Sequence, residues 1–471
     1  MNEENAIMET RIEKDSLGDR QIPKEAYYGV QTHRAIENFP ISGLKPKQSY
    51  VDATIHIKRA AAVVNRELGL LDAKKADAIV KAADEILNGK LLEWFVVDVY
   101  QAGAGTSHNM NCNEVLANRA IELLGGQKGD YKIVSPNDDV NMAQSTNDVC
   151  PTAIRIGSLI EVRKLLPVLE QLEQAFLKKG KEFDHIIKSG RTHLMDAVPV
   201  RLGQEFTAYG VNVRKHRRAI EQAAETCKEL GIGGTAVGTG LNAHPRFRQM
   251  MVDQLSKQVG IEMRSAEDYF EAMQSLRPMV ELSNAIRNFA QDLSRISNDI
   301  RLLGSGPKTG LAEINLPAVQ PGSSIMPGKV NPSIVEMVNM VCFQVIGCDT
   351  TVLMSAQAGQ LELNVMMPVV AFNLLHEIEI LRNAIDVYVT YCIKGLTANA
   401  ERCQLYAENS TSIVTVLNPH IGYMAAAEIA KEYLKSGKPI RQLVLEKKLL
   451  TEEQLDKVFD LRGMTEPGIH K

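Results

Sequence analysis

The sequence predicts an all-α protein, mainly helical, built around a central bundle of long helices. Apolar residues recur at alternating steps of three and four, the spacing of one helix face, most clearly between Pro278 and Leu303. No glycine or further proline interrupts that stretch. The strict alternation of apolar and polar residues that indicates a half-buried strand is almost absent. With 471 residues, the chain is long enough for two or three domains or for one elongated architecture.

Further long helices are expected along the chain. The helix after the proline-rich segment near 330 has Pro332 and Ser333 as start signals. Clear patterns predict helices around 159–176, 334–352 and 372–385, and a weaker pattern predicts a helix around 204–230. Long amphipathic helices need partners, which a single chain supplies as an intrachain bundle and identical subunits supply as a shared core.

Two turn-rich points divide the chain into three expected domains. One is the segment 135–139 (SPNDD), and the other lies near Gly395. We expect a mostly helical N-terminal domain over 1–140, a central long-helix bundle over 141–396, and a small helical C-terminal domain over 397–471. Within the last, Thr-Glu-Glu-Gln at 451–454 is a helix start signal.

The composition excludes several classes of protein. A net charge of -4, with 45% apolar and 23% charged residues, argues against nonspecific nucleic-acid binding. Seven scattered cysteines without a C-x-x-C pair favour reduced thiols over a disulfide framework. The N-terminus is acidic, and no run of about 18 apolar residues occurs. These features predict a cytoplasmic protein with no membrane span.

Four polar segments punctuated by glycine or rich in hydroxyls and amides interrupt the helical pattern. Residues 322–332 (GSSIMPGKVNP) cannot be helix and combine two hydroxyls, a cation and a carboxamide. The others are 103–111 (GAGTSHNMN), 144–148 (QSTND) and 190–193 (GRTH). Each of these three alone is typical of a turn or helix cap. All four together, with Lys329 as a fixed cation, describe a site for a small polyanion.

Such a site suits removal of a proton from the carbon beside a carboxylate. The product is a dianionic enediolate, so hydrogen-bond donors must converge on that carboxylate. The residues leave the base open between His193, His108 and a serine oxyanion. A serine can act only if loop amides and Lys329 stabilise its alkoxide. The flexible 322–324 turn is built like a lid that would close over it.

The 322–332 loop matches the signature of the aspartase/fumarase superfamily, which the chain resembles over nearly its whole length. Members eliminate a group beside a carboxylate to give fumarate. They are homotetramers whose long helices pool into one core, with active sites where loops of different subunits meet. The resemblance implies that Ser323 is the general base.

The resemblance also implies the substrate-binding residues. The carboxylate that becomes the enediolate is held by Thr106, Ser145, Thr146 and Ser324. The other carboxylate is bound by Lys329, Asn331 and Thr192. The leaving group is recognised by Asn147 and His193.

Within the superfamily, the chain is more similar to the aspartase branch. Fumarases carry Lys at the place of Met142 and Ser at that of Thr146, and a methionine suits an ammonium-bearing substrate. Residues 339–347 and 360–368 also resemble aspartases, whereas Gly328 and His193 are fumarase-like. The implied reaction is reversible deamination of L-aspartate to fumarate. The alternatives are a fumarate hydratase and, less favoured, a catalytically silent structural homologue.

Two other motifs are rejected because the neighbouring sequence does not fit the sites that they would form. Residues 231–236 (GIGGTA) fit the dinucleotide fingerprint, but 223–230 is expected to be helix rather than strand, and Gly238, Gly240 and Pro245 prevent a following helix. His376-Glu377 lacks a second histidine at the spacing zinc needs. We therefore expect no cofactor and no metal site.

Overall fold

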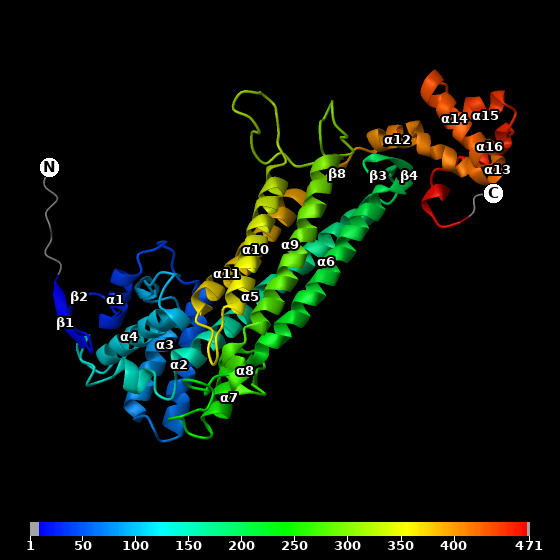
Figure 1. Cartoon of the computed structure of the whole chain (residues 1–471). Helices are drawn as coiled ribbons and strands as arrows, with labels where there is room; N and C mark the ends of the chain where they lie inside the picture. Colours follow the sequence, from blue (N-terminus) through cyan, green and yellow to red (C-terminus); the bar gives the residue numbers. More distant parts are fainter. Residues whose placement is uncertain (1–8, 469–471) are drawn as a thin grey trace. The chain divides into compact units, whose positions relative to one another are not determined.

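The computed structural model describes residues 9–468 and is mainly helical (Figure 1). The helices are α1 (Val30–Asn38), α2 (Gln48–Glu67), α3 (Ala73–Leu87), α4 (Thr106–Leu123), α5 (Thr146–Glu182), α6 (Leu202–Ala224), α7 (Phe247–Val259), α8 (Tyr269–Gln274), α9 (Arg277–Leu303), α10 (Ser333–Gln357), α11 (Met367–Tyr388), α12 (Ala400–Asn409), α13 (Asn418–Ile421), α14 (Tyr423–Ser436), α15 (Ile440–Glu446) and α16 (Glu452–Val458).

The β structure of the described range consists of two-stranded sheets, in the order β1–β2, β3–β4, β5–β6 and β7–β8. The strands are β1 (Thr10–Asp15), β2 (Gly18–Pro23), β3 (Ile187–Thr192), β4 (Met195–Arg201), β5 (Glu229–Leu230), β6 (Arg264–Ser265), β7 (Ile314–Asn315) and β8 (Thr397–Ala398). The β5–β6 pair is parallel, and the others are antiparallel. The predicted all-α fold class is therefore confirmed, with small sheets added to it.

The clear helical patterns correspond to α5, α9, α10 and α11. In α9, every residue of the predicted stripe from Leu282 to Ile300 has no exposed surface. Fully burying one such side chain contributes about 1.5–3 kcal/mol, so this stripe is a major source of stability. The helix α10 begins at Ser333, as the Pro332-Ser333 start signal predicted.

The weaker pattern over 204–230 was wrong at its end. Helix α6 stops at Ala224, a short 3₁₀ turn follows, and Glu229–Leu230 forms strand β5 against Arg264–Ser265. A strand partner 35 residues later along the chain overrides local helix propensity, which no local pattern can show. The rejected dinucleotide motif therefore does follow a strand, but the next helix, α7, begins only at Phe247.

Contacts divide the chain into two compact units, each described here by itself. Unit 1 comprises residues up to Pro167, Arg218–Gln291 and Cys342–Arg382. Unit 2 comprises Val168–Arg217, Asp292–Val341 and the chain from Asn383. The boundaries fall inside α5, α6, α9, α10 and α11, so this division cuts across the three domains expected from the sequence. Those three domains stay a prediction.

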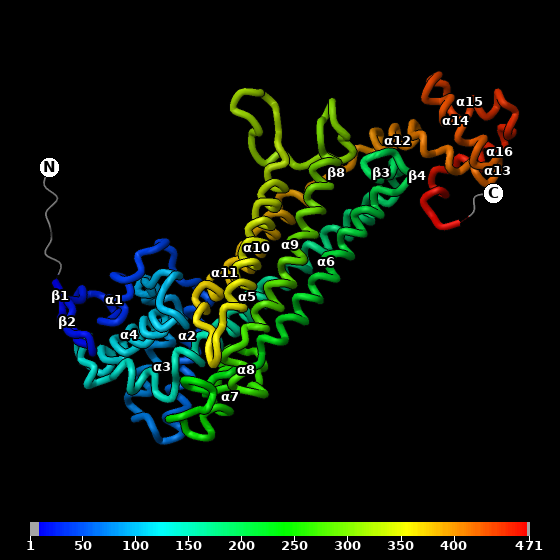
Figure 2. The backbone as a smooth tube through the Cα atoms, viewed as in Figure 1, coloured from blue at the N-terminus to red at the C-terminus, as the bar shows by residue number. Residues whose placement is uncertain are grey.

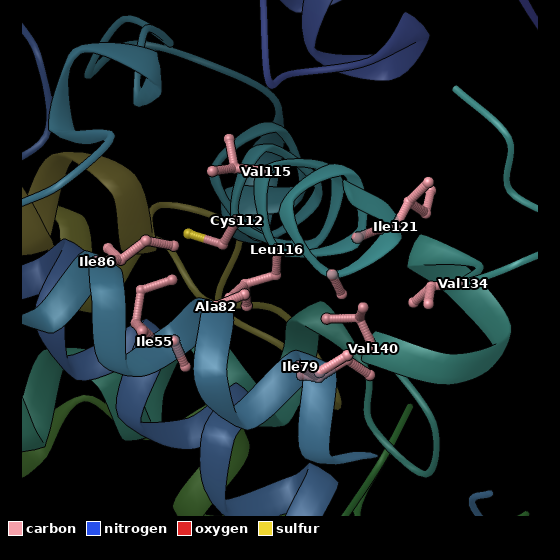
Figure 3. Packing of buried hydrophobic residues seen from close by; sticks show 14 of the residues in the cluster. Ile55, Ile79, Ala82, Ile86, Cys112, Val115, Leu116, Ile121, Val134 and Val140 are labelled. Atoms are coloured by element: carbon pink, nitrogen blue, oxygen red, sulfur yellow. The ribbon is translucent and has the colours of Figure 1, made fainter. Parts of the chain in front are cut away.

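The core of unit 1 lies between α2, α3 and α4 (Figure 3). Side chains such as Ile55, Ile79, Ile86 and Leu116 point toward one another and are fully buried. This core fixes α4, whose first residue, Thr106, belongs to the candidate site.

The C-terminal helices form a second cluster of apolar side chains around Leu417, Leu443 and Leu455. Helix α16 begins with a capping box between Thr451 and Gln454, which confirms the start signal found in the sequence. The seven cysteines of the chain are all free and buried, as expected of reduced thiols in a core.

Among the described residues, one helix, α10, is long and apolar enough to cross a membrane by length and composition alone. Core helices of soluble proteins pass the same test, so this is a weak indication. Several apolar side chains of α10 are exposed in the single chain, including Phe343 at 61% and Met340 at 67%.

Candidate active site

The signature loop joins β7 to α10 and contains neither helix nor strand between residues 316 and 332 (Figure 2). Within it, the Oγ of Ser323 accepts hydrogen bonds from the backbone N–H of Ile325 at 3.2 Å and of Met326 at 2.9 Å. Backbone donors aimed at one oxygen stabilise negative charge on it. The loop therefore supplies the amides that a serine alkoxide requires.

The two ends of this loop are tied together. Gly322 donates its N–H to the carbonyl of Lys329 at 2.8 Å, and the side-chain amide of Asn331 donates to the carbonyl of Gly322 at 2.6 Å. A Cβ at Gly322 would lie 2.6 Å from the Asn331 nitrogen, so the closure requires glycine. The tip is exposed, with Ile325 at 82%. A loop whose two ends are held together by hydrogen bonds and whose tip is exposed has the form expected of a lid.

A cavity of about 690 Å³ lies beside the C-terminal half of this loop. It is lined by 328–332, by the 304–307 loop and by residues of α9 and α10. Lys329 and Asn331 both line it, and Arg301 adds a second cation 3.9 Å from the carboxylate of Glu336. Two of the residues expected to bind a carboxylate, Lys329 and Asn331, thus line one space that also holds Arg301 and Glu336.

Thr192 and His193 lie at the tip of the β3–β4 hairpin, where Thr192 pairs with Met195. The two loop residues, His193 and Leu194, have φ of 54° and 60°, the sign that type I′ turns need at both central positions. Positive φ is costly for residues with a Cβ, and such strain is concentrated at functional sites. Both Thr192 and His193 are exposed. The fold therefore presents them outward.

Ser145, Thr146 and Asn147 form the N-terminus of α5. The Oγ of Ser145 accepts the N–H of Asn147 at 3.2 Å, and the Oδ1 of Asp148 accepts the N–H of Ser145 at 2.9 Å. Asn109 donates to the hydroxyl of Thr146 at 3.3 Å. The first turn of a helix is a favourable place for an anion, because its N–H groups and dipole point there.

Asp148 holds the glycine-rich loop that follows β5. It has no exposed surface, and its Oδ2 accepts the N–H groups of Gly233 at 2.9 Å and Thr235 at 3.0 Å. Asn147 donates to the carbonyl of Ala236 at 2.7 Å. Burial raises the pKa of Asp148 to about 6, against the opposing effect of these hydrogen bonds. The 231–236 segment therefore holds the α5 N-terminus in place.

Two buried residues near this site, Asp148 and Lys58, were assigned no role from the sequence. The Nζ of Lys58 donates to the Oδ1 of Asn141 at 2.8 Å, and Asn109 and Asn113 donate to the same oxygen. Burial lowers the pKa of Lys58 to about 8. The signal that could have found it is its place on the buried face of α2, three residues after Ile55 and four before Ala62.

His108, one of the candidate bases, is fully buried. Its Nε2 lies 3.0 Å from the hydroxyl of Thr54, and its ring stacks on Tyr50 at 4.2 Å. Burial, with the nearby charge of Lys58, lowers the pKa of His108 to about 3. An enclosed, neutral ring without access to solvent is a structural histidine, which leaves Ser323 and His193 as candidates.

The predicted site residues fall into two sets. Unit 1 carries Thr106, Ser145, Thr146 and Asn147. Unit 2 carries Thr192, His193, Ser323, Ser324, Lys329 and Asn331. Hydrogen bonds join Ser145 to Asn147 within the first set, and the signature loop joins four members of the second.

The chain is mainly helical, with hydroxyls and amides at the N-terminus of α5 and a lysine in the signature loop. These are groups that a lyase needs to stabilise charge on a substrate carboxylate. The lyase family pattern matches residues 18–347, and the fumarase C C-terminus pattern matches residues 413–466. The chain belongs to the aspartase/fumarase superfamily, on its aspartase side.

The similar proteins cover the whole chain. It is 49% identical to "Aspartate ammonia-lyase" of Bacillus subtilis over 99% of this chain and 98% of that protein. It is 48% identical to the protein of the same name from Escherichia coli (strain K12), over 97% of this chain and 96% of that one.

Among solved structures, "fumarate lyase:delta crystallin from Brucella melitensis bound to cobalt" aligns with a TM-score of 0.94 at 48% identity, over 98% of this chain and 100% of that one. A class II fumarase from Schistosoma mansoni aligns with a TM-score of 0.94 at 38% identity, over 97% and 99%.

Proposed function

We propose that this protein is an aspartate ammonia-lyase, a carbon-nitrogen lyase that reversibly converts L-aspartate to fumarate and ammonia. The observation that carries the proposal is the near-full-length identity of about half to several aspartate ammonia-lyases. The substrate is a small molecule with two carboxylates, which suits a site rich in hydroxyls, amides and a lysine.

In the proposed mechanism, Ser323 removes the C3 proton of L-aspartate. The N–H groups of Ile325 and Met326 stabilise the alkoxide that does so. The C–H electron pair moves into the adjacent carboxylate and forms an enediolate. That electron pair then returns to make the C2–C3 double bond as the C2–N bond breaks and ammonia leaves. No covalent intermediate is needed, because the substrate carboxylate delocalises the charge.

The remaining roles draw on residues of both sets. Thr106, Ser145, Thr146 and Ser324 hold the carboxylate that becomes the enediolate, and the helix N-termini of α4 and α5 add to this field. Lys329, Asn331 and Thr192 hold the other carboxylate. Asn147 and His193 recognise the amino group that leaves.

Met142 supports ammonia rather than water as the leaving group. A methionine brings no positive charge to the position where fumarases carry a lysine, and its side chain packs partly buried against the core of α2, α3 and α4. A cation here would repel an ammonium-bearing substrate.

We also propose a homotetramer with active sites shared between subunits. Met340, Phe343 and Met354 are exposed in α10. They lie on one face of the helix, because steps of three and eleven residues return to nearly the same side. Gly347 lies on the same face, and a Cβ there would meet nothing within 4 Å. An apolar helix face with a small residue at its centre suits close packing against helices of identical chains. The charge and composition support a place in the cytoplasm.

Fumarate hydratase is the second candidate. It is supported by the likeness to a class II fumarase, by Gly328 and by His193. A catalytically silent homologue is disfavoured, because Ser323, Lys329 and His193 are all present.

The deciding experiment follows fumarate formation by ultraviolet absorbance with purified protein and either L-aspartate or L-malate. Signal with L-aspartate alone supports the ammonia-lyase. Signal with L-malate alone makes the protein a fumarase, and silence with both overturns both proposals.

A further inference from the structure

Glu313 is a fully buried carboxylate held by two cations of strand β3. The Nη1 of Arg191 lies 2.9 Å and 3.0 Å from its two oxygens, and the Nζ of Lys188 lies 3.1 Å from one of them. We call these three side chains the Glu313 clamp. All belong to unit 2.

The clamp joins segments that are distant in the sequence. The backbone N–H of Glu313 donates to the carbonyl of Leu303, the last residue of α9, at 3.0 Å. Asn399 donates to the carbonyl of Glu313 at 2.8 Å, beside the β7–β8 pair. Glu313 thus sits where α9 ends and where the chain enters β7, the strand that leads to the signature loop.

The clamp acts next to the hairpin tip. Arg191 directly precedes Thr192 and His193, which are exposed together with Leu194 at 72% and Met195 at 70%. Side chains this exposed provide little packing to fix their own position. The strained turn at His193 and Leu194 therefore depends on contacts at its base.

Electrostatics indicates that geometry, rather than stability, is the benefit of the clamp. Lys188 is also paired with Glu205 at 2.8 Å, so two cations meet two carboxylates and the charges balance. Replacing a buried ion-pair group by apolar residues is often neutral or stabilising, whereas removing one partner leaves a costly unpaired charge.

We infer that Glu313 is a positioning residue, which through Arg191 fixes Thr192 and His193 at the hairpin tip and ties them to the stem of the signature loop. The inference rests on the proposed function for its effect on catalysis. Its structural part, the ordering of the hairpin, stands independently of the substrate.

The test compares four variants of the full-length protein. Glu313→Gln leaves two cations, Lys188 and Arg191, with one carboxylate, Glu205. The double variant Arg191→Gln/Glu313→Gln restores the balance of charge but not the clamp. Arg191→Gln alone is the third variant. The matched control is Glu161→Gln, because Glu161 is also buried and paired with two cations, Lys164 and Arg382, but lies in unit 1 and in no site.

Three quantities are measured: the melting temperature, hydrogen–deuterium exchange of peptides covering 187–201, and kcat and KM with L-aspartate. We expect Glu313→Gln and Arg191→Gln to speed hairpin exchange and to lower kcat/KM at least about tenfold. The double variant regains melting temperature relative to Glu313→Gln, but neither hairpin protection nor activity. Glu161→Gln lowers the melting temperature alone.

Unchanged hairpin exchange in Glu313→Gln overturns the inference. So does recovery of activity together with melting temperature in the double variant, since that pattern belongs to a purely structural role. If Glu313→Gln does not fold, Arg191→Gln decides by the same two readouts. If the wild type does not act on L-aspartate, the proposed function fails, and hairpin exchange alone still decides whether Glu313 orders the tip.

Discussion

The hydroxyl oxygen of Ser323 accepts the backbone N–H of Met326 at 2.9 Å, three residues further along the signature loop. The N–H of Ile325 reaches the same oxygen at 3.2 Å. A free serine is far too weak a base to remove a proton beside a carboxylate. Two amides fixed on its oxygen lower the free energy of the alkoxide, and exclusion of water by a closing loop strengthens that effect.

Replacing Ser323 by alanine should therefore abolish turnover. Loss of a general base costs about a hundredfold to ten-thousandfold in rate, so we expect kcat with L-aspartate to fall into that range or below it. Size-exclusion chromatography should show an unchanged assembly, because within residues 9–468 the hydrogen bonds to the Ser323 hydroxyl come from its own loop. Ser436→Ala, which removes an exposed hydroxyl on α14, is the control. Turnover near the wild-type rate would remove Ser323 as the base.

Replacing Lys329 by alanine should mainly weaken substrate binding. Lys329 lines the 690 Å³ cavity and would give a carboxylate a charge-assisted hydrogen bond. Such a bond contributes about 1.5–3 kcal/mol, so we expect KM for L-aspartate to rise about tenfold to a hundredfold. Lys308→Ala, an exposed lysine of the same unit, is the control. An unchanged KM in Lys329→Ala would refute the carboxylate role.

The long helices could be predicted from the sequence because their buried faces are apolar. The α9 stripe and the glycine- and proline-rich signature loop are both local patterns, so each could be recognised from its own residues. Helix α4 shows where this stops. It buries His108, Asn109, Asn111 and Asn113, polar residues that a periodicity argument places at the surface.

Those buried amides are stabilised by partners on other elements. The side-chain amides of Asn109 and Asn113 donate to the Oδ1 of Asn141, which also accepts from Lys58. Asn141 and Lys58 are distant in the sequence from α4, so no local pattern reveals these contacts. For the same reason the parallel β5–β6 pair was missed. Site residues carried by motifs could be predicted, whereas the groups that hold them in place could not.

Asp148→Asn should change how activity depends on pH. The pKa of Asp148 is about 6, so in the wild type its carboxylate is ionised above that pH and accepts three backbone N–H groups. Protonation below pH 6 removes acceptor capacity at the α5 N-terminus. We expect kcat/KM to fall below about pH 6 in the wild type and this acid limb to be lost in Asp148→Asn, which is less active throughout. An identical acid limb in both proteins would assign it to another group.

The stability of the same pair of proteins should depend on pH in the opposite sense. Burial raises the pKa of Asp148 from 3.8 to about 6, so between these values the folded chain holds a proton that the unfolded chain releases. This contribution to stability is complete below pH 3.8 and is lost as the pH rises to about 6. The melting temperature of the wild type, relative to that of Asp148→Asn, should therefore decline from pH 4 to pH 6 and then level. A constant difference would mean that the pKa is not raised.

Replacing Phe343 by aspartate should break the assembly. Phe343 is 61% exposed on the apolar face of α10, one turn from Met340 and Gly347, and a charge there would lose its water when helices of identical chains pack. We expect light scattering to show a tetramer for the wild type and a smaller species for the variant, with activity lost if, as proposed, the sites are shared between subunits. Met424→Asp, on the exposed surface of α14, is the matched control and should keep both mass and activity. A tetramer that survives Phe343→Asp would place the interface elsewhere, and a monomeric, active wild type would refute shared sites altogether.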